Sequence, residues 1–233
     1  MMPRGRQRSR TRLPSARRLS HRLLEALGPQ DWWPARSAFE MMAGAILTQA
    51  TAWHNVEHAL ANLRAARALS AHRVVQVPAR RLERLIRPAG FFRQKAARLH
   101  AYARWYLQRC GADPRRMRRM ACADLRGELL ELPGIGPETA DAIMGYVARQ
   151  PIFVVDAYAR RILSRHGLID GRESYDEIQR RVMRQLPRDR HVLNEFHALL
   201  VETGKRFCHR RDPACRSCPL GRFPHHVEAR GDG

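Results

Sequence analysis

The sequence is short of the features that mark disulfide-rich, membrane-spanning and disordered proteins. It has only five cysteines in 233 residues, too few for a disulfide scaffold. No stretch approaches the roughly 18 uninterrupted apolar residues of a membrane span. A hydrophobic fraction of 44% argues against a disordered chain. The sequence therefore predicts a folded protein that does not span a membrane, with one large domain or two smaller ones.

Lysine is nearly absent, although the chain is strongly basic. Only Lys95 and Lys205 are lysines among 43 basic residues, which stand against 22 acidic ones and give a formal charge of +21. Such an excess favours a polyanionic partner, most often nucleic acid. The arginine bias reflects either coding bias or the bidentate phosphate contacts that guanidinium makes. Any mechanism that needs an amine nucleophile has only two side chains to choose from.

The distribution of apolar residues predicts an all-α fold. Residues 1–18 hold seven arginines and no acidic residue, so we predict a disordered tail over 1–20. From Leu19 onward apolar residues recur at three and four positions, as in amphipathic helices. The one strand-like stretch, 152–155, is short and has no hairpin partner. Later helices are expected over 122–131, 137–148, 157–166, 174–186 and 191–204.

The segment 132–140 (LPGIGPETA) separates two of these helical patterns. Two glycines around one apolar residue permit a tight turn that exposes successive backbone amides, and Pro137 suits the first position of a helix. An ordinary corner between helices is the plain interpretation. Amides at a helix N-terminus can also bind phosphate without reading base sequence. In a chain this basic we favour phosphate binding, by Gly134, Ile135, Gly136 and Thr139.

Asp156 follows the apolar run Phe153-Val154-Val155, eighteen residues after Glu138. An aspartate before a helical pattern is commonly an N-cap. It is equally interpreted as a carboxylate held at the mouth of a cleft by the apolar run behind it. The two roles are compatible, because a capping side chain is also well oriented.

Three motifs together resemble a known family. The hairpin, Asp156 and the upstream segment 46–51 (ILTQAT) are similar to the helix-hairpin-helix DNA glycosylases of the endonuclease III superfamily, over about residues 22–220. The resemblance implies two helical domains with an active-site cleft between them. The expected ranges are 37–150 for a barrel-like domain with the helix-hairpin-helix motif (about 122–148), 21–36 plus 151–220 for the second domain, and 221–233 for a tail.

The resemblance also implies a mechanism, a partner and a location. The damaged nucleotide is flipped out of double-stranded DNA, and Gln49 fills the gap. Asp156 stabilises the oxocarbenium-like sugar and orients or deprotonates a water molecule. We expect a monomer in the bacterial cytoplasm, associated with the nucleoid, with no membrane partner.

Glu138 departs from the pattern of the bifunctional family members, which carry a lysine at this position. That amine forms a Schiff base with the sugar, which a carboxylate cannot do. The resemblance therefore implies a monofunctional glycosylase that uses water and leaves an abasic site. Glu138 either lines the pocket or complements the dipole at the start of its helix.

Further matches are similar to the bacterial 3-methyladenine glycosylases, at 32–34 (WWP), 49–53 (QATAW), 87–91 (RPAGF) and 94–96 (QKA). They imply that aromatic faces hold an alkylated purine, whose positive charge they attract. Core packing is the alternative for the three tryptophans. A solvated surface position is the alternative for Lys205. The predicted base pocket consists of Trp32, Trp33, Pro34, Trp53, Glu138 and Lys205.

The cysteine loop 208–218 matches only part of the family's iron–sulfur motif. Cys208, Cys215 and Cys218 have the spacing C-x6-C-x2-C, which is similar to three of the four ligands of a [4Fe–4S] cluster. Pro224 stands where the fourth cysteine is expected, and His225 beside it is a substitute ligand. A zinc site from three cysteines and a histidine, or a loop without metal, are the alternatives.

Two other functions stay open at this point. One is an endonuclease III-like glycosylase for oxidised or mismatched bases, with or without lyase activity. The other is a non-enzymatic protein that binds damaged DNA.

Overall fold

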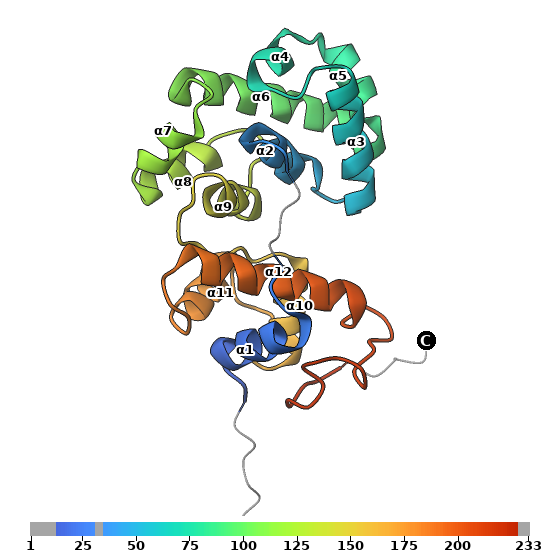
Figure 1. Ribbon diagram of the computed structural model, residues 1–233, viewed down its shortest axis with the longest axis vertical. Helices are drawn as coiled ribbons and strands as arrows, with labels where there is room; N and C mark the ends of the chain where they lie inside the picture. The colour runs from blue at the N-terminus through green and yellow to red at the C-terminus, as the bar shows by residue number, and fades with distance from the viewer. Residues whose placement is uncertain (1–12, 31–34, 228–233) are drawn as a thin grey trace, which may run out of the picture. The chain divides into compact units, whose positions relative to one another are not determined.

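The computed structural model describes residues 13–30 and 35–227. Within these residues the chain forms twelve α-helices and one short 3-10 helix, and no strand, which confirms the predicted all-α class (Figure 1). The strand-like stretch 152–155 is buried but forms no β-ladder. None of the helices in the described ranges combines the length and the apolar character that a membrane span needs.

The chain divides into two compact units. One consists of residues 1–30, 155–187 and 195–233, and the other of 31–154 and 188–194. Each differs from the expected ranges at its edges: 31–36, 151–154 and 188–194 belong to the second unit. The first unit holds α1 (Ala16–Leu27), α10 (Ala157–Arg165), α11 (Tyr175–Met183) and most of α12 (Arg190–Arg206).

Helix α1 starts inside the stretch that the sequence predicts as a disordered tail. Ser15 is its N-cap, and its hydroxyl accepts a hydrogen bond from the Arg18 amide at 3.3 Å. Ala16, Leu19 and Leu23 are fully buried along one face. The tail prediction is therefore wrong for residues 16–20, because the arginines there occupy the solvent face of a helix whose apolar face is packed. Residues 1–12 of the predicted tail lie outside the described part of the chain.

The C-terminal segment is also more ordered than a tail. Leu220 is fully buried, the Arg18 guanidinium lies 5.3 Å from the centre of the Phe223 ring, and the His226 amide donates to the Arg165 carbonyl at 2.7 Å. The prediction of a tail from residue 221 is wrong up to residue 227, because long-range contacts hold this segment against α1 and α10.

The second unit is built around α2 (Ala38–Leu47). All of its residues after Ala38 are buried, and the helix packs against α3, α6 and α9. Its one acidic residue, Glu40, is paired with Arg64 at 2.7 Å. The other elements of this unit are α3 (Trp53–Ala65), α4 (Ala71–Gln76), α5 (Ala79–Leu85), η1 (Arg87–Ala89), α6 (Phe92–Cys110), α7 (Pro114–Arg119), α8 (Cys122–Leu130) and α9 (Pro137–Tyr146).

A buried ion pair joins the two helices on either side of the hairpin. The Arg126 guanidinium of α8 contacts the carboxylate of Asp141 on α9, with the shortest N–O distance at 2.8 Å. The Asp141 side chain has no exposed surface, whereas Arg126 keeps 22% of its side chain exposed. Removing one partner of such a pair leaves the other charge without a counter-ion, which is costly. The contact therefore holds α8 and α9 together on either side of the hairpin.

Replacing Asp141 by alanine should therefore destabilise the protein by about 3 kcal/mol. Urea unfolding of the wild type and of Asp141→Ala measures the difference. Arg109→Ala is the matched control, because it breaks a half-exposed pair with Glu128 and should cost under about 1 kcal/mol. Equal losses in the two variants would contradict a structural role for the buried pair.

Candidate functional site

The hairpin between α8 and α9 is a tight turn with one obligatory glycine. The Ile135 amide donates to the Leu132 carbonyl at 3.0 Å and closes the turn, and the Ile135 side chain is buried. Gly134 has a φ of +73°, in the left-handed region. Gly136 is the N-cap of α9 and has extended backbone, with Pro137 at the first helical position as predicted. The amides of the first turn of α9 have no acceptor within the helix.

The two glycines of the hairpin are under different constraints. A Cβ atom at Gly134 would overlap the Arg98 side chain, in addition to requiring a strained backbone. A Cβ atom at Gly136 would meet no atom within 4 Å. The folded protein therefore requires glycine at 134. At Gly136 the missing side chain leaves open space above the start of α9.

Gln49 connects the hairpin to the helices that pack behind it. Its side-chain Nε2 donates to the Gly134 carbonyl at 3.0 Å and to the Thr139 hydroxyl at 2.9 Å. Its Oε1 accepts a short hydrogen bond from Arg98 of α6. The structure thus brings together three residues that the sequence marks as DNA-binding: Gln49, Gly134 and Thr139. In this state the Gln49 amide is engaged by the protein on both its donor and its acceptor side.

Lys95 is buried behind the same region. Its ammonium donates to the carbonyls of Leu47, at 2.9 Å, and Ala89, at 2.7 Å, and the residue is only 1% exposed. Burial, reinforced by the nearby Arg98 guanidinium, lowers the pKa of Lys95 to about 8. The ammonium is therefore enclosed by main-chain carbonyls rather than presented at the surface.

Phe91 is an exposed residue of the matched segment 87–91 to which the sequence analysis assigned no role. It is 64% exposed, the highest fraction among the large exposed hydrophobic residues of the described chain. Its φ of 45° is in the left-handed region, where a bulky residue is strained. An exposed, strained aromatic side chain at the start of α6 has no packing role. The neighbouring glycine, Gly90, is the signal in the sequence that marks a turn there.

In the first unit, Asp156 is the N-cap of α10, which confirms one of its two interpretations. Its Oδ1 accepts from the Ala159 amide at 2.7 Å, and the side chain is 14% exposed. The residue before it, Val155, donates its amide to the Tyr175 hydroxyl at 3.2 Å. Asp156 is thus fixed on both sides, and its second oxygen, Oδ2, is not used by the helix.

Helix α12 contributes two residues of the first unit to the surroundings of Asp156. His197 is 3% exposed, and its Nε2 lies 3.6 Å from Asp156 Oδ2. Gly204 lies against the ring of Tyr158, where any side chain would overlap it, so α10 and α12 approach closely. Lys205 is exposed in the last turn of α12. His197 has no predicted role in the sequence analysis, because its relevance depends on its packing against Asp156.

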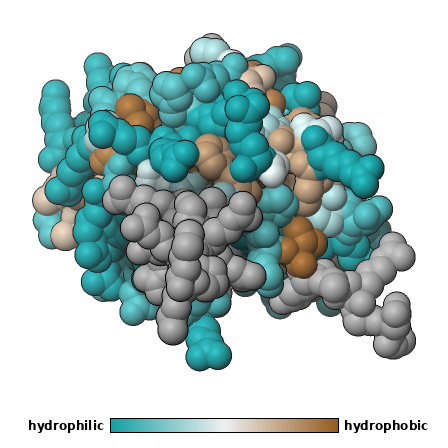
Figure 2. Space-filling model, turned by 90° about the horizontal axis from the view of Figure 1, so that it is seen from below, coloured by the Kyte–Doolittle hydropathy of each residue, from teal (hydrophilic) through white to brown (hydrophobic). Residues whose placement is uncertain are grey.

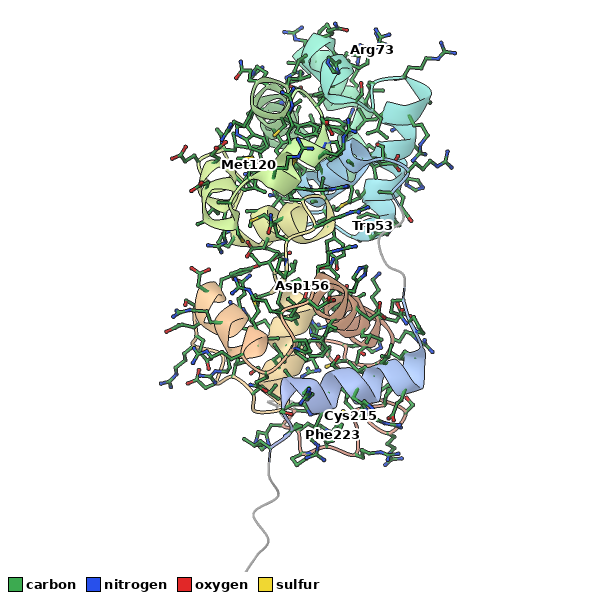
Figure 3. All side chains as sticks on the ribbon, turned by 60° about the vertical axis from the view of Figure 1, so that its left-hand side comes forward. Trp53, Arg73, Met120, Asp156, Cys215 and Phe223 are labelled. Carbon is green, nitrogen blue, oxygen red and sulfur yellow. The ribbon has the colours of Figure 1, made fainter. Side chains whose placement is uncertain are left out.

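The predicted base pocket is described only in part. Trp32, Trp33 and Pro34 lie outside the described residues. Trp53 is the first residue of α3, is partly exposed, and donates its indole N–H to Glu57 at 3.0 Å. Glu138 is exposed in the first turn of α9, where a carboxylate complements the helix dipole. Figure 3 shows the positions of Trp53 and Asp156 on their respective units.

Two arginines of α10 hold the cysteine loop. Arg161 donates to the Cys208 carbonyl at 2.8 Å. Arg165 donates to the Cys208 sulfur at 3.0 Å and to the His209 carbonyl at 2.8 Å. Burial raises the pKa of the Cys218 thiol. The loop is therefore fixed by guanidinium contacts to its first cysteine, and Figure 3 shows Cys215 within it.

The residues of the loop do not complete a cluster site. A [4Fe–4S] cluster takes four thiolate ligands, and this loop supplies three, Cys208, Cys215 and Cys218. His225, the predicted substitute, lies next to His166, with ring centres 5.6 Å apart. Across residues 13–30 and 35–227, no three His, Cys, Asp or Glu side chains are grouped so as to hold a metal ion. The cluster stays a prediction from cysteine spacing. Of the two remaining cysteines, Cys110 is buried as expected and Cys122 is partly exposed.

The face of the molecule drawn in Figure 2 is mainly hydrophilic, with hydrophobic residues in small separate patches. This agrees with a chain that carries 43 basic side chains. The preference for a polyanion follows from composition, with 43 basic against 22 acidic residues.

Comparison with known families identifies the class. Residues 43–188 match the model of the HhH-GPD superfamily of base excision DNA repair proteins. The match covers more than half of the chain and includes both the hairpin and Asp156, so the chain belongs to this superfamily. It is accordingly a base excision DNA glycosylase, and DNA is its partner.

Individual relatives agree with this assignment. MJ1434 of Methanocaldococcus jannaschii, named as a candidate DNA repair glycosylase, is 42% identical over 206 residues, which are 86% of this chain and 91% of the relative. Endonuclease III of Thermotoga maritima is 28% identical over 84% of this chain and 86% of its own. The H. pylori 3-methyladenine DNA glycosylase MagIII, solved with 1,N6-ethenoadenine, has a TM-score of 0.73 and 27% identity, covering 83% of this chain and 98% of MagIII.

The difference between the glycines is testable by stability alone. Gly134→Ala should lower the free energy of unfolding by about 1 kcal/mol or more, because the native φ is unfavourable for alanine and Arg98 must move. Gly136→Ala should change it by less than about 0.5 kcal/mol. Gly127→Ala, in the middle of α8 with open space around it, is the control and should stabilise by about 0.5 kcal/mol. Equal effects at 134 and 136 would contradict the described hairpin.

Proposed function

We propose that this chain is a monofunctional DNA glycosylase that excises alkylated purines, such as 3-methyladenine, and leaves an abasic site. The proposal rests on one combination of features: the Asp156 carboxylate is anchored, and the hairpin carries no lysine side chain. The carboxylate is fixed at the start of α10, while the position of the family's lysine nucleophile holds Glu138. The chemistry therefore uses water in place of an amine.

Asp156 acts on the sugar. As the bond between C1′ and the base nitrogen breaks, its electron pair leaves with the base and the sugar becomes an oxocarbenium-like cation. The Asp156 carboxylate stabilises that cation, and its Oδ2, which is not used in helix capping, orients the attacking water. The water oxygen bonds to C1′ and its proton passes to the carboxylate or to solvent. Because Oδ1 is held by the Ala159 amide, the group is preorganised before DNA binds.

The second unit binds the DNA backbone and deforms the duplex. Amides at the start of α9 bind a backbone phosphate, in the open space that Gly136 leaves. Gln49 and Phe91 enter the duplex when the base is flipped, Gln49 through the gap and Phe91 as an apolar wedge. The high exposure of Phe91 supports this role, because burial between bases compensates the cost of exposing an aromatic ring to water.

The positions of the two lysines support hydrolysis without strand cleavage. Lys95 is enclosed, with its ammonium bound to two carbonyls. Lys205, the only other lysine, stands on α12 and not on the hairpin. Schiff-base chemistry has no amine at the family's position, so the enzyme should not cleave the abasic site.

Two observations support an alkylated purine as substrate. A purine alkylated on the ring carries positive charge, which favours departure of the base and attracts aromatic faces such as that of Trp53. MagIII, whose name gives 3-methyladenine as its base, is covered over 98% of its length. The second candidate is an endonuclease III-like activity on oxidised or mismatched bases, which the similarity to the Thermotoga maritima enzyme favours.

Asp156→Asn should lower the rate of base release by at least about 100-fold, because the amide cannot stabilise the sugar cation. Asparagine caps helices as well as aspartate, so stability should change by less than about 0.5 kcal/mol and DNA binding should persist. Release of 3-methyladenine from methylated DNA measures the rate. Asp189→Asn, at another helix-capping aspartate, is the matched control and should be fully active. Base release by Asp156→Asn at the wild-type rate would contradict the catalytic role of Asp156. No base release by the wild type, with equal binding of damaged DNA by both proteins, would favour a non-enzymatic DNA damage-binding protein.

Borohydride trapping on abasic DNA separates the two glycosylase classes. The wild type should give no covalent adduct, because Glu138 offers no amine. Glu138→Lys places an amine at the family's position and should give an adduct that survives denaturing electrophoresis. An adduct formed by the wild type would contradict the monofunctional assignment, and its loss in Lys205→Met would identify the responsible amine.

A further inference from the structure

Lys95 is a charged side chain in the interior of the second unit that the proposed chemistry does not use. It is among the largest fully buried side chains of the described chain, at 1% exposure. Its ammonium donates hydrogen bonds to two main-chain carbonyls, those of Leu47 at 2.9 Å and Ala89 at 2.7 Å. Holding a cation away from water is costly unless its donors are hydrogen-bonded, and these two carbonyls offset part of that cost.

The two carbonyls belong to two different segments. Leu47 is the last residue of α2, two positions before Gln49. Ala89 is the last residue of η1, two positions before Phe91. Carbonyls at helix ends have no intrahelical donor and carry partial negative charge, so they attract an ammonium. Because Lys95 contacts both, one nitrogen atom ties together the segments that lead into Gln49 and Phe91.

The same helix also contacts a side chain of the first segment, that of Gln49. Arg98, one turn after Lys95 on α6, donates to Gln49 Oε1. Lys95 therefore holds the backbone that leads into Gln49, and Arg98 holds the side-chain amide of Gln49. Phe91 is held by the Lys95 contact to Ala89 and by its own carbonyl, which accepts from the Lys95 amide at 3.0 Å. All of these contacts originate on the first two turns of α6.

We propose that Lys95 is a positioning residue that couples Gln49 to Phe91, so that the two side chains enter DNA as one unit. The inference rests on the proposed function, in which these two residues insert into the duplex. An ammonium has three donors and can satisfy two diverging carbonyls at once. An apolar side chain of the same length would fill the space but leave both segments free to move apart.

The test uses the full chain and a duplex that carries a tetrahydrofuran abasic analogue with 2-aminopurine opposite it, whose fluorescence rises when the base is unstacked. Gln49→Ala and Phe91→Ala are measured singly and together, with Lys95 and in the Lys95→Met background. When Lys95 is present, the losses of fluorescence caused by Gln49→Ala and Phe91→Ala should be non-additive. In the Lys95→Met background the two losses should add. Lys95→Met alone should reduce unstacking about tenfold, with binding to undamaged duplex changed less than about twofold.

Matched variants separate positioning from stability and from charge. Arg104→Met removes one positive charge from an exposed position on the same helix and should leave unstacking unchanged. If Lys95→Met does not fold, Lys95→Gln, which keeps two neutral donors, replaces it and should retain part of the coupling. Non-additivity of the same size in both backgrounds would overturn the coupling role while leaving the proposed function intact. A wild type that unstacks no base would overturn the insertion of Gln49 and Phe91 and with it the coupling, whereas the proposed function is tested separately by release of 3-methyladenine.

Discussion

The hydrogen bonds of the Gln49 side chain are the constraint on which the arrangement of the hairpin in the second unit depends. One amide group contacts the hairpin carbonyl of Gly134, the hydroxyl of Thr139 and the guanidinium of Arg98. These partners lie on the hairpin, on α9 and on α6, so the amide fixes three elements that are distant in sequence. The turn can then keep a glycine with positive φ and present the start of α9 in one orientation. Insertion of Gln49 into DNA requires these bonds to be exchanged for bonds to the bases.

Asp156 shows how a common structural role prepares a chemical one. A capping carboxylate uses one oxygen to satisfy an orphan amide, which fixes its rotamer without any additional support. Its other oxygen then points in a defined direction, with His197 on α12 at 3.6 Å. The close approach of α10 and α12 depends on Gly204, which leaves room for the Tyr158 ring. Stability and preorganisation come from the same contacts here, so little extra strain is needed to hold the carboxylate.

The parts of the site that sequence reasoning found are those whose signals are local. A Gly-x-Gly turn followed by proline fixes a hairpin within five residues, and an aspartate between an apolar run and a helical pattern indicates an N-cap. Phe91 and Lys95 lie in segments that the sequence analysis matched to the family, but neither they nor His197 received a role, because their importance comes from exposure, burial or contact with distant segments. The start of α1 was missed because charge composition outweighed the spacing of Ala16, Leu19 and Leu23. The C-terminal segment was missed for the same reason: the contacts of Phe223 and His226 are with helices far away in sequence.

Base specificity is the central claim, and direct analysis of released bases tests it best. Purified full-length protein is incubated with methylated duplex DNA and, separately, with DNA oxidised to contain thymine glycol, and the free bases are separated by chromatography. The account predicts release of 3-methyladenine, intact abasic strands and no release from the oxidised DNA. Release of thymine glycol with strand cleavage, and none of 3-methyladenine, would contradict it and favour an endonuclease III-like enzyme.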